Sequence, residues 1–113
     1  MKCCEVMYEQ NLLADAVRLA DSFGTRLRGL MFKESLQSGE GLLLQNCPSV
    51  HCCFMHFPID VVYLDAEYRV LDRETVRPWH LGKQVKHARN VLELAEGKAA
   101  GIPAGAMLQI REK

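Results

Sequence analysis

The sequence predicts a mainly β domain, a small antiparallel sandwich or barrel of about seven short strands with one short helix, at the margin of the α+β class. Apolar runs of strand length recur along the chain, and turn residues separate them, for example at residues 39–41, 65–67 and 103–105. Only one segment has apolar residues at helical spacing. Short runs between regularly spaced turns are typical of antiparallel sheets, whereas long helices alternating with strands would indicate a parallel sheet.

Length and composition indicate a single domain over residues 1–113. Of these residues, 49% are apolar and 25% are charged, as in an ordinary globular protein with one packed core. The 14 basic and 14 acidic residues cancel, so no overall field attracts nucleic acid or an anionic membrane. We therefore expect a soluble monomer or weak dimer, with no nucleic acid partner and no membrane contact.

The N-terminal residues and the cysteines favour a cytoplasmic protein. Glu5 and Glu9 interrupt the apolar run that a signal peptide would need. The longest apolar stretches, such as residues 61–64, are far too short to span a bilayer. Five cysteines are an odd number, which favours reduced thiols over a disulfide framework.

The strand candidates are short apolar runs. In residues 59–64 both alternating faces are largely apolar, which indicates a central strand covered on both sides. Residues 68–73 mix apolar and charged positions on both faces, which indicates a strand that reaches the surface. The candidate runs are residues 12–13, 17–19, 42–45, 59–64, 68–71, 91–94 and 107–110.

One helix is predicted after residue 22, with Asp21 and Ser22 as possible N-caps. Gly24 and Gly29 weaken this helix by about 1 kcal/mol each relative to alanine, so contact with the sheet must hold it. A second helical turn is possible at residues 96–101. Four apolar residues at positions i, i+4, i+7 and i+8 form one face of the first predicted helix. They are Phe23, Leu27, Leu30 and Met31.

Several short motifs follow one another from residue 16 to residue 110. They include Arg-Leu-Arg-Gly-Leu-Met at residues 26–31, Phe-Pro-Ile-Asp at residues 57–60 and Gly-Ile-Pro-Ala-Gly at residues 101–105. In this order they resemble the family known as domain of unknown function 192. The resemblance implies a small, mainly β sandwich-like or barrel-like domain and no established activity, cofactor or catalytic residue. Similar sequences carry other residues at Cys52, Cys53 and His56.

Thiols and imidazoles are concentrated near the middle of the chain. Zinc and other soft transition metals prefer such ligands. However, no C-x-x-C spacing is present, and adjacent cysteines on a strand would point to opposite faces. We therefore expect no metal and no cofactor, and treat the thiols as small buried apolar groups. The cluster consists of Cys47, His51, Cys52, Cys53 and His56.

Asp60 lies in the apolar run of residues 59–64. An unpaired carboxylate there would cost several kcal/mol or be driven neutral, so it needs a partner. Among the motif residues, Arg26 and Arg28 could pair with it in bidentate fashion, and His51 could donate a ring N–H. Asp60 is then either a structural fastener of the motif, which we favour, or part of a pocket for a polar ligand.

Trp79 is the single tryptophan and follows Arg77 and Pro78. An aromatic ring beside an arginine is a common ligand platform, although a lone tryptophan is more often a core anchor. The surrounding residues 69–89 are rich in basic side chains, but Asp72 and Glu74 dilute their charge and no nucleic-acid-binding motif is present.

The leading functional hypothesis is a non-catalytic binding or interaction module. Its shallow polar groove would take a small polar ligand or a protein segment, because no nucleophile elbow, phosphate-binding loop or standard metal motif is present. The alternative is a small enzyme, a hydrolase or a thiol- or metal-assisted catalyst, that uses His51 with Asp60 or with Cys52. The expected ligand-binding residues are Arg26, Arg28, His51, Asp60 and Trp79.

Overall fold

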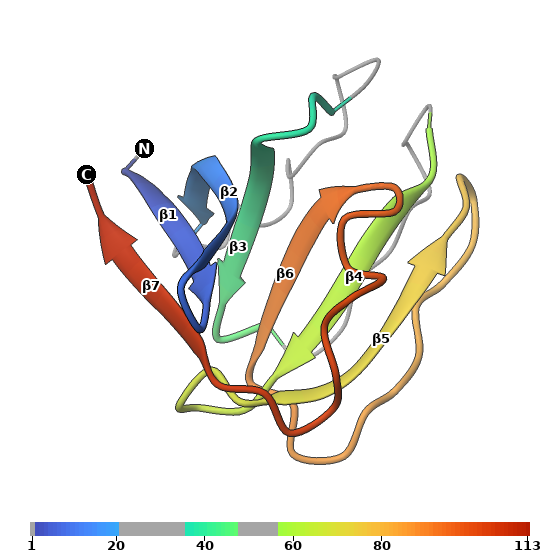
Figure 1. Ribbon diagram of the computed structural model, residues 1–113. Coiled ribbons are helices and arrows are strands. Elements are labelled where there is room, and N and C mark those ends of the chain that lie inside the picture. The colour runs from blue at the N-terminus through green and yellow to red at the C-terminus, as the bar shows by residue number, and fades with distance from the viewer. Residues whose placement is uncertain (1, 21–35, 48–56) are drawn as a thin grey trace.

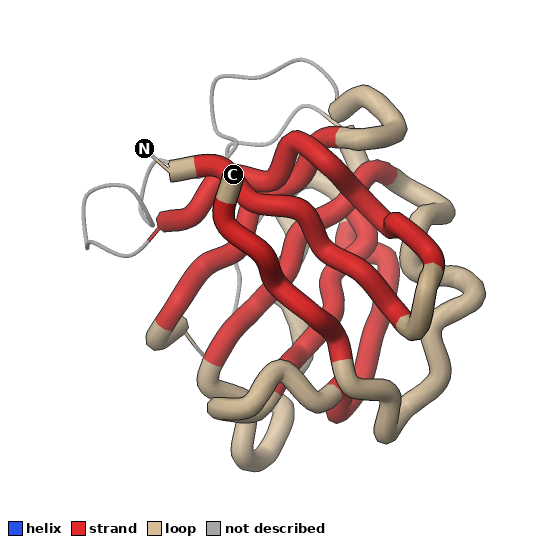
Figure 2. Tube along the Cα trace, turned by 60° about the vertical axis from the view of Figure 1, so that its left-hand side comes forward, coloured by secondary structure: helices blue, strands red, loops and turns tan. Residues whose placement is uncertain are grey.

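The computed structural model describes residues 2–20, 36–47 and 57–113. These residues form one sheet that curls into a half-barrel, with the two chain ends close together (Figures 1 and 2). The mainly β prediction is confirmed, and no helix occurs among the described residues. The strands are β1 (Cys3–Tyr8), β2 (Asn11–Ala20), β3 (Glu40–Gln45), β4 (Ile59–Leu64), β5 (Val70–Val76), β6 (Asn90–Ala95) and β7 (Leu108–Glu112).

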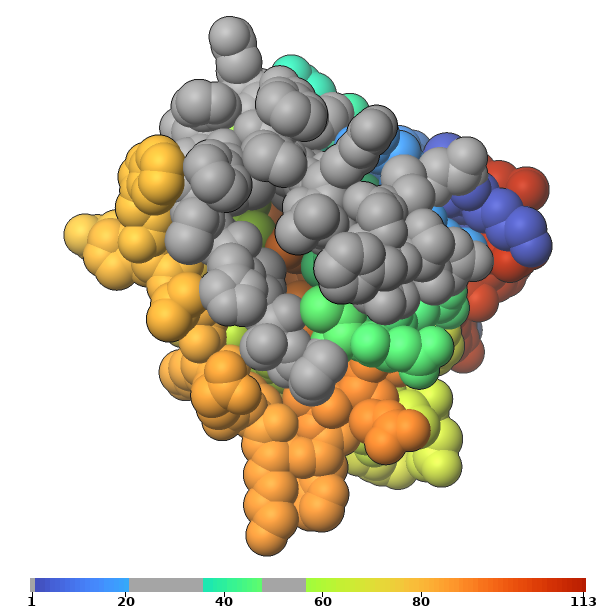
Figure 3. Space-filling model, turned by 180° about the vertical axis from the view of Figure 1, so that it is seen from behind, coloured from blue at the N-terminus to red at the C-terminus, as the bar shows by residue number. Residues whose placement is uncertain are grey.

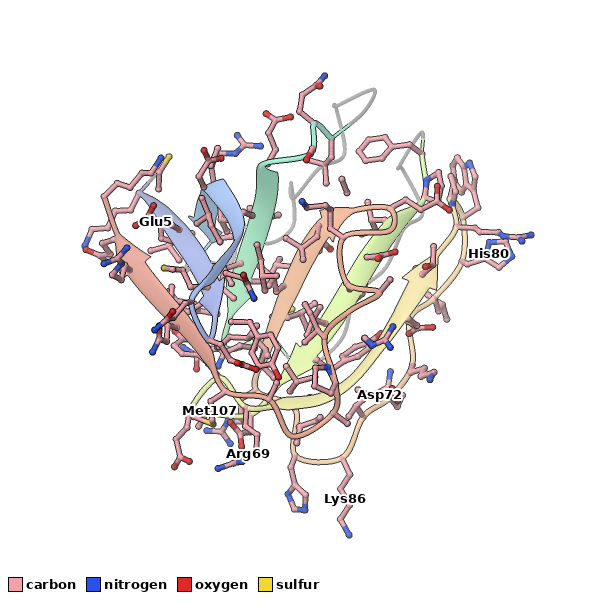
Figure 4. All side chains as sticks on the ribbon, viewed as in Figure 1. Glu5, Arg69, Asp72, His80, Lys86 and Met107 are labelled. Atoms are coloured by element: carbon pink, nitrogen blue, oxygen red, sulfur yellow. The ribbon has the colours of Figure 1, made fainter. Side chains whose placement is uncertain are left out.

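The strand order across the sheet is β5-β4-β6-β3-β2-β1-β7. All neighbours are antiparallel except β2 and β3, which run parallel, so the antiparallel prediction is wrong for this one pair. The two edges of the sheet approach each other at one end. There Arg69 and Met107 form an isolated bridge, and their side chains lie side by side in Figure 4. The N–H of Leu108 also donates to the carbonyl of Tyr68 at 3.0 Å, which partly closes the barrel.

The strands differ from the predicted runs in three places. β1 was not predicted, and residues 12–13 and 17–19 belong to one long strand, β2. Residues 96–101 form successive turns instead of a helical turn, because their hydrogen bonds join residues three apart, such as the N–H of Lys98 to the carbonyl of Ala95 at 3.1 Å. The predicted helix and its apolar face lie outside the described residues. In the described part of the chain, no helix has the length and apolar character needed to cross a bilayer.

The inner face of the sheet carries the larger apolar cluster. This cluster contains side chains from all seven described strands. A single cluster can include side chains from every strand only on the concave side of a curled sheet. The turn region after β6 closes it with Ala99, Ile102 and Ala106. Its strand residues are Cys4, Val6, Ala14, Val17, Leu19, Leu43, Val62, Leu64, Val70, Leu92, Leu94 and Leu108.

The outer face carries a second cluster on the central strands. Side chains alternate along each strand, so Leu42 and Val61 point outward while Leu43 and Val62 point inward. Val85 and Ala88, in the loop between β5 and β6, pack against this outer cluster. The prediction that residues 59–64 form a strand covered on both sides is therefore confirmed. The outer cluster consists of Ala20, Leu42, Leu44, Ile59, Val61, Tyr63, Val76, Ala88 and Val91.

Leu92→Ala should lower the free energy of unfolding by about 2 to 5 kcal/mol, because it removes a fully buried side chain from the inner cluster. Leu12→Ala is the matched control, since Leu12 is 51% exposed and its truncation should cost less than about 0.5 kcal/mol. Urea denaturation of both variants measures the difference. Equal effects of the two substitutions would contradict the described packing.

Candidate functional site

The structure describes two of the five predicted site residues. Asp60 is 4% exposed and lies on β4, with its side chain toward the inner face. Trp79 is 69% exposed in the loop that follows β5. One is buried and the other is open to solvent, so the structure does not present them together on one accessible surface. Arg26, Arg28 and His51 lie outside the described residues.

Asp60 accepts hydrogen bonds from groups that the sequence analysis did not consider. Thr75, directly opposite on β5, donates its hydroxyl to Oδ1 at 2.8 Å. The backbone N–H groups of Gly97 and Ala99 donate to Oδ2 at 3.0 and 2.9 Å. The burial of Asp60 is thus compensated by hydrogen bonds. Asp60 fastens the turn after β6 to β4 and β5.

Trp79 lies in a loop that hydrogen bonds hold in shape. The N–H of His80 donates to the carbonyl of Arg77 at 3.2 Å, and His80 Nδ1 lies 2.8 Å from the carbonyl oxygen of Pro78. Leu81 is 67% exposed, so two large apolar side chains are open to solvent within three residues. The loop points away from the sheet, as His80 shows in Figure 4. The alternative of Trp79 as a core anchor is therefore wrong.

A polar network on the outer face ties this loop to the sheet. The hydroxyl of Tyr63 donates to Glu74 Oε2 at 2.5 Å, and the N–H of Lys83 donates to the same oxygen at 2.7 Å. Lys83 Nζ also lies 3.2 Å from Asp72 Oδ2. Burial, reinforced by the bond to Glu74, holds the pKa of Tyr63 well above its usual value. Tyr63 is therefore a neutral hydrogen-bond donor and not a base.

Asp72 stays ionised in this network. The N–H of Arg73 and the ammonium of Lys83 lower the pKa of Asp72 below its usual value.

The loop between β5 and β6, yellow to orange in Figure 3, forms one rim of the molecule seen from behind. Its anchoring at Glu74 and Asp72 means that Trp79 and Leu81 sit on a preformed surface.

Glu93 is a buried carboxyl group that the sequence analysis missed. It lies at the centre of β6, is 4% exposed, and faces outward between Leu42 of β3 and Val61 of β4. Burial raises the pKa of Glu93 to about 8, so it is mostly protonated at neutral pH. The sequence does contain a signal for this buried acid. Residues 91–94 place one acidic residue in an apolar run, which is the pattern that also marks Asp60.

A shallow surface pocket of about 380 Å³ lies beside the start of β5. Neither Asp60 nor Trp79, the two described residues of the predicted site, lines it. Arg73, one of its walls, donates its Nε to the carbonyl of Ile102 at 2.7 Å. The pocket is lined by Val70, Asp72, Arg73 and Ala104.

The cysteines of the described residues are further candidates for metal ligands and nucleophiles: Cys4 is buried, Cys3 is exposed and Cys47 is partly buried. No group of three or more His, Cys, Asp or Glu residues in residues 2–20, 36–47 and 57–113 could hold a metal ion. Burial raises the pKa of Cys4 to about 11, so this thiol is not ionised at neutral pH. Of the predicted Cys and His cluster, the described residues include Cys47 alone, which is partly buried.

Comparison with known proteins gives sequence relatives without an established activity. The chain is 38% identical over 89 residues to a UPF0127 protein of Pyrococcus horikoshii, which covers 76% of this chain and 77% of that protein. A UPF0127 protein of Thermococcus kodakarensis is 36% identical over 81 residues, or 68% of this chain. The match spans 52% of the Thermococcus protein, about half of its length.

A solved structure shares the fold. A protein of unknown function from Novosphingobium aromaticivorans superposes with a TM-score of 0.80 and 22% sequence identity, covering 95% of this chain and 83% of that one. The sequence also matches the profile of DUF192, described as "Uncharacterized ACR", over residues 6–110. This match spans every described strand except the start of β1 and the end of β7. The chain belongs to the DUF192 family.

Proposed function

We propose that this protein is a non-catalytic binding module that uses the loop around Trp79 to hold a small polar ligand or a protein segment. The observation that carries the proposal is the exposure of Trp79 (69%) and Leu81 (67%) on a loop anchored by Glu74. Exposed tryptophan on a rigid support is enriched at recognition sites, because its ring contributes a large contact area at little entropic cost. Arg26, Arg28 and His51 of the sequence motif complete the proposed groove.

The contacts of Asp60 support a module more than the alternative enzyme. In the form of that enzyme that uses His51 with Asp60, the imidazole would need a carboxylate oxygen of Asp60 as its partner. The described contacts of this carboxylate, from Thr75 to Oδ1 and from the turn after β6 to Oδ2, instead join β4, β5 and that turn. Asp60 therefore enters the proposed function as the residue that shapes the scaffold.

Trp79→Ala should weaken ligand binding at least tenfold, a loss of about 1.4 kcal/mol or more, and leave the melting temperature nearly unchanged. The single tryptophan reports binding directly, so its fluorescence can be titrated with a panel of small polar compounds and short peptides. A calorimetric titration then compares Trp79→Ala with the control Leu12→Ala, which truncates another exposed apolar side chain. Ligands that bind Trp79→Ala as tightly as the parent, or a panel that moves neither fluorescence nor melting, would contradict the proposal.

A further inference from the structure

The surface pocket beside β5 has walls from two parts of the chain that the fold holds together. Its described walls are Val70, Asp72 and Arg73 of β5 and Ala104 of the turn region before β7. The N–H of Gly105 donates to the carbonyl of Val70, and the N–H of Val70 donates to the carbonyl of Ala106, both at 2.8 Å. These backbone bonds fix the turn against the strand, so the pocket of about 380 Å³ is preformed and open to solvent.

The carboxylate of Asp72 lies at the open edge of the sheet and already has partners. β5 is an edge strand, and the N–H of Arg73 donates to Asp72 Oδ1 at 2.7 Å. The other oxygen, Oδ2, lies 3.2 Å from Nζ of Lys83. The negative charge in the pocket wall is therefore compensated by groups of the chain itself.

Arg73 carries the positive charge of the pocket, and its guanidinium group is held in one orientation. Its Nε donates to the carbonyl of Ile102, and Ile102 is 1% exposed in the inner cluster, so this acceptor is fixed. Within the described residues, neither Nη group of Arg73 has a hydrogen bond or an ion pair. Two parallel N–H donors on an oriented plane match the two oxygens of a carboxylate.

We propose that this pocket binds the carboxylate group of a small ligand, and that the two Nη groups of Arg73 each donate to one of its oxygens. The volume of the pocket suits a small acid with a short stem, and Ala104 offers a methyl group for contact with that stem. Trp79 is not one of the described walls. The site is therefore separate from the loop of the proposed function and goes beyond it.

Asp72 makes the site selective for ligands with a single negative charge. Its carboxylate is ionised, because the N–H of Arg73 and the ammonium of Lys83 lower its pKa, and it lines the same pocket as the guanidinium of Arg73. A second negative charge on the ligand is repelled by Asp72, so a carboxylate should bind better than a phosphate dianion. A small organic acid and the C-terminus of a peptide both present this group.

Butyrate and N-acetylalanine are the probes, with butyramide and N-acetylalaninamide as their uncharged counterparts and inorganic phosphate as the dianion. NMR titration at neutral pH and constant ionic strength follows the amide signals of Arg73 and Gly105 and the Nε signal of Arg73. Each acid should bind about tenfold more tightly than its amide, and butyrate more tightly than phosphate. N-Acetylalanine binding more tightly than butyrate indicates a peptide C-terminus as the source, and the opposite order indicates a small organic acid.

Arg73→Gln should weaken butyrate binding about tenfold, and Arg73→Lys should weaken it as well, because lysine keeps the charge but not the two parallel donors. Arg69→Gln is the matched control. Arg69 donates from Nη1 to the carbonyl of Gly105 in the same turn at 3.3 Å but does not line the pocket, so this variant should bind like the parent. Asp72→Asn should reduce the preference for butyrate over phosphate. Amide NMR spectra confirm that each variant is folded.

Three outcomes would overturn the inference: equal binding of an acid and its amide, unchanged binding in Arg73→Gln, or an equal loss in Arg69→Gln, which would show that the surface charge acts without a site. Phosphate binding more tightly than butyrate would also contradict it. These outcomes are separate from the test of the proposed function. If Trp79→Ala changes no ligand binding while Arg73→Gln abolishes that of butyrate, the loop assignment fails and the pocket stands.

Discussion

Asp60→Leu should lower the free energy of unfolding by about 3 to 5 kcal/mol, a large share of the stability of a domain of this size. Leucine accepts no hydrogen bond, so the N–H groups of Gly97 and Ala99 and the hydroxyl of Thr75 would lose their acceptor. The Ala99 N–H is buried and cannot turn to water without opening the inner cluster. Urea denaturation followed by circular dichroism measures the loss, since Trp79 is already exposed in the native state.

Asp60→Asn should cost much less, about 1 kcal/mol. The amide can turn so that its oxygen accepts from Gly97 and Ala99 while its NH₂ group donates to the Thr75 hydroxyl. Thr75→Val, which removes one of the three bonds and keeps the side-chain shape, should cost a similar amount. If Asp60→Asn leaves the melting temperature intact but abolishes ligand binding, Asp60 belongs to the working site and the structural interpretation is wrong.

The strands were predictable wherever one face is apolar along the whole run. Residues 42–45, 59–64 and 91–94 match β3, β4 and β6 almost residue for residue, because all three are buried on both sides. β1 was missed because it is a strand near the edge of the sheet that turns only Cys4 and Val6 inward, among polar and half-buried neighbours. Asp15, exposed in the middle of β2, divided one strand into two predicted runs.

Pairings between distant residues could not be predicted. The parallel pair of β2 and β3 depends on how the chain crosses between them, and no local pattern specifies this. The partners of Asp60 come from positions 15 to 39 residues later in the chain, two of them backbone groups of a turn that carry no side-chain signal. The sequence therefore indicated that Asp60 needed partners but not which groups they are.

The exposure of the Trp79 side chain to solvent could not be predicted from the sequence. A lone tryptophan is usually buried, whereas Trp79 is 69% exposed on a loop that a hydrogen bond from the N–H of Lys83 ties to Glu74. Glu93 was a different omission, because residues 91–94 were treated as a plain apolar run. Glu93 lies in the middle of a buried strand, as Asp60 does, so the same cost of burying a carboxyl group applies to it.

The stability of this protein should fall as the pH rises from about 5 to about 8, and Glu93→Gln should remove most of that fall. The carboxyl of Glu93 has a pKa of about 8 in the folded protein, against an ordinary value of 4.5. Below pH 4.5 the carboxyl of Glu93 is protonated in both the folded and the unfolded protein, so it does not change the free energy of unfolding with pH. Between these values only the unfolded chain releases the proton, so the free energy of unfolding falls by about 1.4 kcal/mol per pH unit, or about 5 kcal/mol in all.

Urea denaturation of the parent and of Glu93→Gln at several pH values isolates this contribution, because the other titrating groups cancel in the difference between the two proteins. The two should be about equally stable at pH 5, and the glutamine variant should gain steadily until about pH 8, above which the difference stays constant. Glu96→Gln should show no such gain, since its carboxyl is exposed in the folded state. A parent protein that instead gains stability over glutamine as the pH rises would show that Glu93 is ionised and paired in the native state, because only a favourable charge partner makes the folded form release its proton more readily than the unfolded chain does.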